Sequence, residues 1–135
     1  MSFTPMPLEH SLEFRVSYYE TDGQARVHHS QYLNFFERGR VELMRFLGHS
    51  YRNLEATGLM LVVAEMNVRY LGAAQFDDIL KLTTSVTEAR GATIRHAYRL
   101  VRSDDDSLIV QADSRIACVD RDGRVRRLPA YLRVV

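Results

Sequence analysis

The chain has 135 residues, of which 46% are hydrophobic, and its net charge at neutral pH is +1. This length predicts a single domain, residues 1–135, that can bury a core of ordinary size. The small net charge excludes the broad positive field that attracts nucleic acids or anionic membranes, so neither partner is expected.

Secretion, membrane insertion and disulfide formation are not expected either. The first ten residues lack a basic segment followed by an apolar run, and no apolar stretch approaches the length of a membrane span. The one cysteine, Cys118, excludes an intrachain disulfide and is predicted to be a small buried residue on a strand. We therefore expect a cytoplasmic protein.

The first predicted element is a half-buried strand. From Ser11, apolar and polar residues alternate, which places one set of side chains on a single face: Leu12, Phe14, Val16 and Tyr18. A polar turn, Glu20 to Ser30, follows. It contains Asp22, His28 and His29, so a carboxylate and two imidazoles precede the next element.

That element is a long helix, predicted from Gln31 to Leu47. Its apolar residues recur at spacings of three and four: Tyr32, Phe35, Phe36, Leu43, Met44, Phe46 and Leu47. Ser30 is the expected N-cap, and Gly48 is placed to end the helix. Free backbone N–H groups at a helix N-terminus favour negative charge, so the polar turn lies where an anion would be stabilised.

The rest of the chain is predicted to be a short helix and then strands. The helix covers Ser50 to Ala56, before Gly58, and the strands are Leu59–Tyr70, Ile79–Glu88, Ala92–Arg102, Leu108–Val119 and a short one around Arg124–Arg127. Tight turns between strands imply antiparallel neighbours. Because the long helix is apolar around most of its circumference, we expect a curved antiparallel sheet to wrap around it, with Gly39 at a close contact.

Several stretches resemble the hotdog-fold acyl-CoA thioesterases of the 4-hydroxybenzoyl-CoA thioesterase type. They are Tyr19-Glu20-Thr21-Asp22, the segment from Val27 to Leu33, and Phe36-Glu37. The resemblance implies an α+β hotdog fold and hydrolysis of acyl- or aroyl-CoA thioesters to free acid and CoA. It also implies a homodimer or homotetramer whose subunits share each active site, with strand Leu59–Tyr70 as the seam.

The resemblance assigns roles to individual residues. Asp22 is the expected catalytic carboxylate, acting either as a general base on water or as a nucleophile. The backbone N–H at His29 is the expected oxyanion donor, with its side chain assisting. Tyr32 is expected to line the acyl pocket. Family members usually have glycine where this chain has Ala25, and alanine there predicts an altered turn, because glycine allows a positive φ.

Binding of the substrate requires basic groups, because coenzyme A carries several phosphates. The densest basic cluster is Arg124, Arg126 and Arg127, with Arg69 and Arg26 as weaker candidates. The carrier of the acyl group, coenzyme A or acyl-carrier protein, stays open. No separate cofactor is expected.

Other readings of the same residues remain open. A hydratase or dehydratase acting on an acyl thioester would use a His–acid pair, and Glu37 is the alternative catalytic acid if it does not pair with Arg38 or Arg40. A non-catalytic acyl-CoA-binding module is the third reading. A metal site is not expected, because His28 and His29 are adjacent and no third ligand stands at metal spacing.

Overall fold

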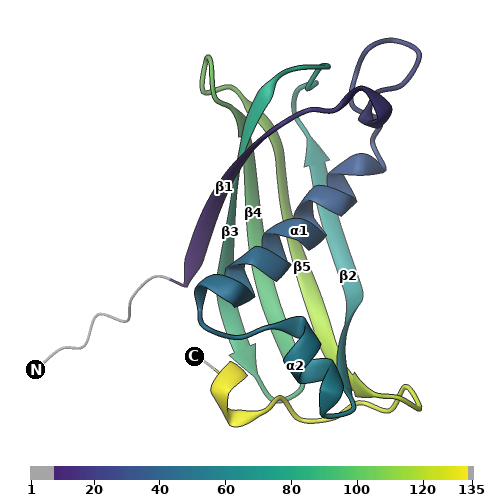
Figure 1. Cartoon of the computed structure of the whole chain (residues 1–135), viewed down its shortest axis with the longest axis vertical. Helices are drawn as coiled ribbons and strands as arrows, with labels where there is room; N and C mark the ends of the chain where they lie inside the picture. The colour runs from purple at the N-terminus through teal and green to yellow at the C-terminus, as the bar shows by residue number, and fades with distance from the viewer. Residues whose placement is uncertain (1–7, 134–135) are drawn as a thin grey trace, which may run out of the picture.

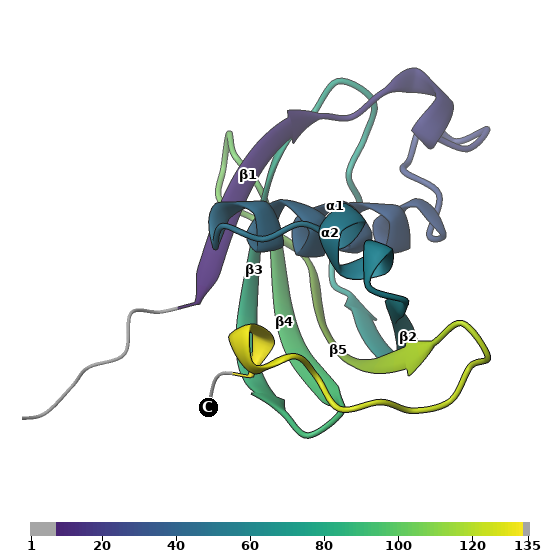
Figure 2. The same cartoon turned by 60° about the horizontal axis from the view of Figure 1, so that its bottom comes forward.

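The computed structural model describes residues 8–133, which form one antiparallel sheet and a long helix. The strand order is β1-β3-β4-β5-β2, with β1 and β2 at the two edges. The strands are β1 (Glu9–Arg15), β2 (Leu59–Tyr70), β3 (Ile79–Arg90), β4 (Thr93–Arg102) and β5 (Leu108–Asp120). The long helix α1 (Gln31–Phe46) crosses the concave face of the sheet (Figure 1), and α2 (Tyr51–Ala56) follows it. The sheet curls around α1 (Figure 2), which confirms the predicted α+β architecture.

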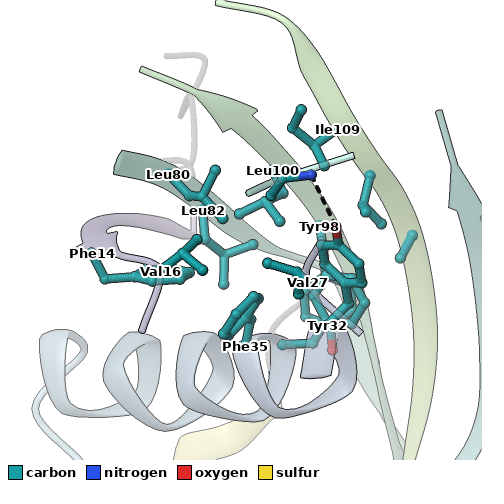
Figure 3. Close-up of a cluster of buried hydrophobic side chains, with 14 residues drawn as sticks. Phe14, Val16, Val27, Tyr32, Phe35, Leu80, Leu82, Tyr98, Leu100 and Ile109 are labelled. Carbon is teal, nitrogen blue, oxygen red and sulfur yellow. Dashed lines mark hydrogen bonds between the residues drawn. The ribbon is translucent and has the colours of Figure 1, made fainter. Parts of the chain in front are cut away.

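Helix α1 buries the stripe that its spacing predicts. The buried residues of the stripe face the sheet and include Tyr32, Phe35, Phe36, Leu43 and Met44. Figure 3 shows Tyr32 and Phe35 pointing from the helix toward Leu80 and Leu82 of β3 and Leu100 of β4. Phe46, by contrast, is 60% exposed, because it lies at the end of the helix beyond the sheet-facing stripe.

Two glycines of the helix region have clear physical roles. A Cβ built on Gly39 would lie 2.8 Å from Leu82 Cδ2 and would overlap Thr84 Oγ1, so glycine is what lets α1 approach β3. Gly48 has a φ of +90° just after the helix, a conformation that glycine adopts without steric cost. Both expectations for these glycines are confirmed.

Edge strand β2 has a more complex pattern than simple alternation. A bulge between Val63 and Glu65 shifts its register against β5, and an extra residue of this kind reverses which side chains face the core. Leu61 packs inward before the bulge and Met66 after it. Val62 and Met66 therefore do not share one face, although they are four residues apart, and both Val62 and Val63 are exposed.

One predicted strand end and one predicted short strand are also wrong. The first strand ends at Arg15, and Tyr18 is 76% exposed in the 3₁₀ turn η1 (Tyr18–Glu20), because the chain leaves the sheet after Val16 bonds Asp78. No strand forms at residues 124–127; only an isolated bridge between Val119 and Val125 is present. A second 3₁₀ turn, η2 (Ala130–Leu132), follows.

Two further expectations concern Cys118 and the membrane. Cys118 is fully buried on β5 as a free thiol, which confirms its predicted place, and burial raises its pKa. Within residues 8–133, no helix is long and apolar enough to cross a membrane.

Candidate active site

Asp22 lies in the turn that connects η1 to α1, and its carboxylate closes that turn. Its Oδ1 accepts hydrogen bonds from the backbone N–H of Gln24 (2.8 Å) and of Arg26 (3.3 Å). The backbone adds a bond from the Asp22 N–H to the Arg26 carbonyl (2.7 Å). Within the described residues, no donor bonds Asp22 Oδ2. One oxygen of this exposed carboxylate therefore holds the turn, and the other has no donor in the described part of the chain.

Ala25 occupies the left-handed region of the backbone in the same turn. Its φ is +65°, a conformation that costs an L-residue other than glycine roughly 1–2 kcal/mol. Alanine therefore does not prevent the left-handed conformation that glycine would adopt here. Gly23, in contrast, does not have a positive φ.

The turn is held against the linker between β2 and β3. The Val27 N–H donates to the Ala74 carbonyl (2.9 Å), and the Phe76 N–H donates to the Ala25 carbonyl (3.3 Å). Arg26 forms an isolated bridge with Gln75. The turn and the linker therefore form one hydrogen-bonded unit, placed at one end of the molecule (Figure 1).

Arg102, at the end of β4, anchors this linker. Its Nη2 donates to the Ala73 carbonyl at 2.7 Å, and its Nε donates to Asp78 Oδ2 at 3.0 Å. Its Nη1 reaches Asp105 and Ser107, and the hydrogen bond with Asp78 is the largest of the effects that raise the pKa of Arg102. Sequence reasoning missed this residue, because its partners lie in two separate loops that no local pattern connects.

The histidines occupy the last residues before α1. The His28 Nδ1 accepts from the Ser30 N–H (3.2 Å) and lies 2.7 Å from the Ser30 hydroxyl, and its ring stacks on that of His29 with centroids 4.2 Å apart. Ser30 has helical dihedral angles and no capping bond. Ser30 therefore occupies the predicted N-cap position, but its side chain makes no capping hydrogen bond, because its hydroxyl bonds His28 instead.

The backbone N–H of His29 has no acceptor among the described residues. The carbonyl of His29, which belongs to the next peptide unit, accepts from the Tyr70 hydroxyl at 3.2 Å, and this bond restrains the backbone on the C-terminal side of the N–H. An N–H just before a helix N-terminus, without an acceptor of its own, has the properties of an oxyanion donor.

Tyr32 lies in the core and not on an open surface of the single chain. It is 3% exposed, its hydroxyl accepts from the Ala74 N–H (3.3 Å), and its ring packs edge-on against Tyr70. Burial is the main cause of its raised pKa. Tyr32 therefore supports the linker beneath the turn, and its predicted role in lining the acyl pocket stays a prediction.

The basic cluster does not meet the turn within one chain. All three of its arginines, Arg124, Arg126 and Arg127, are exposed, and Arg126 Nε donates to Asp120 Oδ2 at 2.8 Å. Figure 1 shows the loop after β5 at the end of the sheet opposite the turn that contains Asp22.

The alternative catalysts gain little support from the geometry. Glu37 is exposed and forms no ion pair with Arg38 or Arg40 in the described part of the chain. No group of three metal-ligating side chains occurs in residues 8–133, and no hydrogen bond joins Asp22 to His28 or His29 there.

Comparisons with known proteins point to one family. A family model described as the thioesterase-like superfamily matches residues 16–133. The acyl-CoA thioesterase YbgC of Haemophilus influenzae is 40% identical over 111 residues, which cover 82% of this chain and 80% of that protein.

Solved structures agree. A probable thioesterase from Bartonella henselae superposes with a TM-score of 0.82 at 33% identity, covering 90% of this chain and 99% of that one. A 4-hydroxybenzoyl-CoA thioesterase superposes with a TM-score of 0.84 at 19% identity, over 91% and 95% of the two chains, which is a likeness of fold alone.

Proposed function

The chain belongs to the thioesterase-like superfamily and is a thioester hydrolase of the hotdog fold. From that premise we propose that it hydrolyses acyl- or aroyl-CoA, with Asp22 as the reacting carboxylate. The observation that supports this assignment is that the two carboxylate oxygens of Asp22 differ in their hydrogen bonds. One of its oxygens holds the turn, and the other has no donor among the described residues.

The proposed reaction begins at the thioester carbonyl carbon. Asp22 either removes a proton from the attacking water or attacks directly to form a mixed anhydride that water then hydrolyses. The His29 N–H, which bonds no acceptor in the described chain, donates to the oxygen as it becomes negative. In both routes the C–S bond breaks as the tetrahedral intermediate collapses, and the thiolate leaves and takes up a proton. With Asp22 as general base this step gives the free acid; with Asp22 as nucleophile it gives the mixed anhydride, and water then hydrolyses the anhydride to the free acid and restores Asp22.

Substrate binding and assembly are further parts of this proposal. The cluster of Arg124, Arg126 and Arg127 is the proposed site for the phosphates of coenzyme A, and an acyl-carrier protein is the other carrier to be tested. We also propose a homodimer joined along β2, or a tetramer of such dimers, because β2 is a free sheet edge that exposes Val62 and Val63. A cytoplasmic location remains a prediction, supported by the free thiol of Cys118.

Replacing Asp22 by asparagine tests the catalytic role. The amide oxygen of asparagine can still accept from the Gln24 and Arg26 N–H groups, so Asp22→Asn is expected to fold with the turn intact. Release of free CoA thiol from acyl- and aroyl-CoA should nevertheless fall by ~10²–10⁴-fold if Asp22 is a general base, and by more if it is the nucleophile.

The matched control is Asp104→Asn, which changes an exposed acid in the β4–β5 turn and should leave the rate unchanged. Full activity of Asp22→Asn would remove Asp22 from the mechanism. Enoyl-CoA and β-hydroxyacyl-CoA belong in the same panel, because turnover of these two alone would indicate a hydratase.

A further inference from the structure

A cavity lies beneath the C-terminal half of α1, away from the turn that contains Asp22. Its volume is about 210 Å³, and neither Asp22 nor His29 lines it. Its walls come from α1, α2, η2 and the adjacent ends of β2, β3 and β4, at the end where α2 and η2 approach the sheet (Figure 2). Because a cavity of about 150 Å³ can hold benzene, this one has room for a chain of several carbons.

The walls are mostly apolar, with a small polar group at one place. Apolar wall residues include Leu43, Met44, Leu61, Val86 and Ile94. The polar wall residues include Arg40 of α1, Tyr51 of α2 and His96 of β4. Apolar walls with a few convergent polar groups are the usual composition of a small-molecule site.

Arg40 is a buried cation without a carboxylate partner in the described residues. It is 7% exposed, and its Nη1 donates to the Tyr98 hydroxyl at 2.9 Å. Tyr98, accepting from Arg40, can donate in turn to Ser114 Oγ at 2.7 Å. This chain of contacts contains hydroxyl groups and no carboxylate, and no acid within residues 8–133 forms an ion pair with Arg40. A buried charge left unpaired is costly, so this position favours an anion.

His96 is a second unsatisfied polar group in the same wall. It is 5% exposed, and its Nδ1 has no hydrogen-bond partner in the described chain. Burial, aided by the charge of Arg40, lowers the pKa of His96 to about 3, so the ring is neutral near pH 7. Arg40 therefore remains the cation of this wall, and the orphaned ring nitrogen can join a ligand's hydrogen bonds. The nearby Tyr51 hydroxyl also stays neutral, because burial raises its pKa.

We propose that this cavity is a second ligand site that binds a short-chain carboxylate, with the anionic group against Arg40 and the alkyl chain among the apolar walls. The site is separate from Asp22, and it distinguishes a free acid from a neutral thioester because only the acid carries a charge for Arg40. The acids that thioester hydrolysis releases have this chemistry, but binding at the cavity does not depend on the proposed reaction.

Calorimetric titration with hexanoate, hexan-1-ol and acetate tests the proposal. Hexanoate should bind at least about tenfold more tightly than either of the others, because only hexanoate has both the charge and the chain. Asp22→Asn should bind hexanoate like the parent protein, which separates this site from the catalytic one. Equal affinity for hexanol, or no hexanoate binding, would overturn the proposal.

Variants locate the binding to the cavity. Arg40→Met should weaken hexanoate binding at least about tenfold while leaving hexanol binding unchanged, whereas Arg45→Met, at an exposed arginine of the same helix, should have no effect. If Arg40→Met does not fold, Leu61→Trp fills the cavity from β2 without removing the charge and should abolish binding. Hexanoate binding that survives Leu61→Trp would place the ligand elsewhere and contradict the assignment.

Discussion

Ala25 shows at the scale of one residue that the turn containing Asp22 is under backbone strain. Its φ of +65° is a conformation that glycine adopts at no steric cost. The strain lies beside the carboxylate, in a turn that is closed by Asp22 itself and braced by the β2–β3 linker. Such strain persists only when the surrounding contacts define the conformation.

Replacing Ala25 by glycine should therefore stabilise the protein. Relief of roughly 1–2 kcal/mol of strain, offset by about 0.5–1 kcal/mol of lost chain entropy, leaves an expected gain of about 0.5–1 kcal/mol. Urea unfolding measures it. The control is Ala56→Gly, at an exposed position of α2, which should destabilise by about 0.5–1 kcal/mol. A loss of stability in Ala25→Gly would show that the left-handed conformation costs alanine little here.

Individual residues also mark the limit of sequence reasoning. Asp22 and His29 could be selected because acid, histidines and helix start are close along the chain. Arg40 could not, because its partner Tyr98 is 58 residues away and an arginine on a helix is ordinarily exposed. Ser30 stands at the predicted N-cap position of α1, but the absence of a capping bond could not be predicted, because the nearby His28 ring competes for the Ser30 hydroxyl.

At the scale of elements, the contact between α1 and β3 decides how closely helix and sheet pack. A methyl group at position 39 would meet Leu82 at 2.8 Å and overlap the Thr84 hydroxyl, both of which are buried. An alanine in an ordinary helix interior would be favourable, so the two effects oppose each other, and the steric one is larger in a closely packed core.

Gly39→Ala should consequently destabilise the protein by about 1–3 kcal/mol. Thermal and urea unfolding provide the measurement. Gly23→Ala is the control, because a Cβ there meets nothing within 4 Å, and its effect should stay within about 0.5 kcal/mol. Adding Thr84→Ala to Gly39→Ala should recover part of the loss; no recovery would mean that Thr84 does not cause it.

Elements with a strong period could be predicted well, and their irregular ends could not. The predicted helix from Gln31 to Leu47 differs from α1 by one residue, because its apolar stripe faces one continuous surface. The bulge after Val63 depends on pairing with β5, which a single strand does not encode. Residues 124–127 alternate like a strand but pair only with the last residues of β5, at the isolated bridge between Val119 and Val125, because β4 and β2 occupy the two sides of β5 along most of its length.

At the scale of the whole molecule, one edge of the sheet, β2, exposes adjacent apolar residues that another chain could bury. Val63 of β2 is 51% exposed, beside exposed Val62. The other edge, β1, alternates exposed polar residues with inward apolar ones and has no such pair. The two edges therefore differ in their tendency to pair with another chain.

Val63→Lys should weaken a β2-joined dimer by at least about tenfold, or about 1.4 kcal/mol, because it places a charge on each side of the seam. Analytical ultracentrifugation gives the association constant, and thioesterase activity per chain should fall with it if the subunits share each site. Glu13→Lys on β1 is the control for an edge charge. An unchanged dimer in Val63→Lys would exclude β2 as the seam.

The position of β2 has a consequence for the distance between the Asp22 carboxylate and the arginines of the loop after β5. These groups occupy opposite ends of one chain (Figure 1). If two copies paired antiparallel along β2, related by a twofold axis, the arginine end of each copy would lie beside the carboxylate end of the other. The dimer would then contain two complete sites. In each site, one chain would supply the carboxylate and the other chain would supply the arginines that bind the nucleotide.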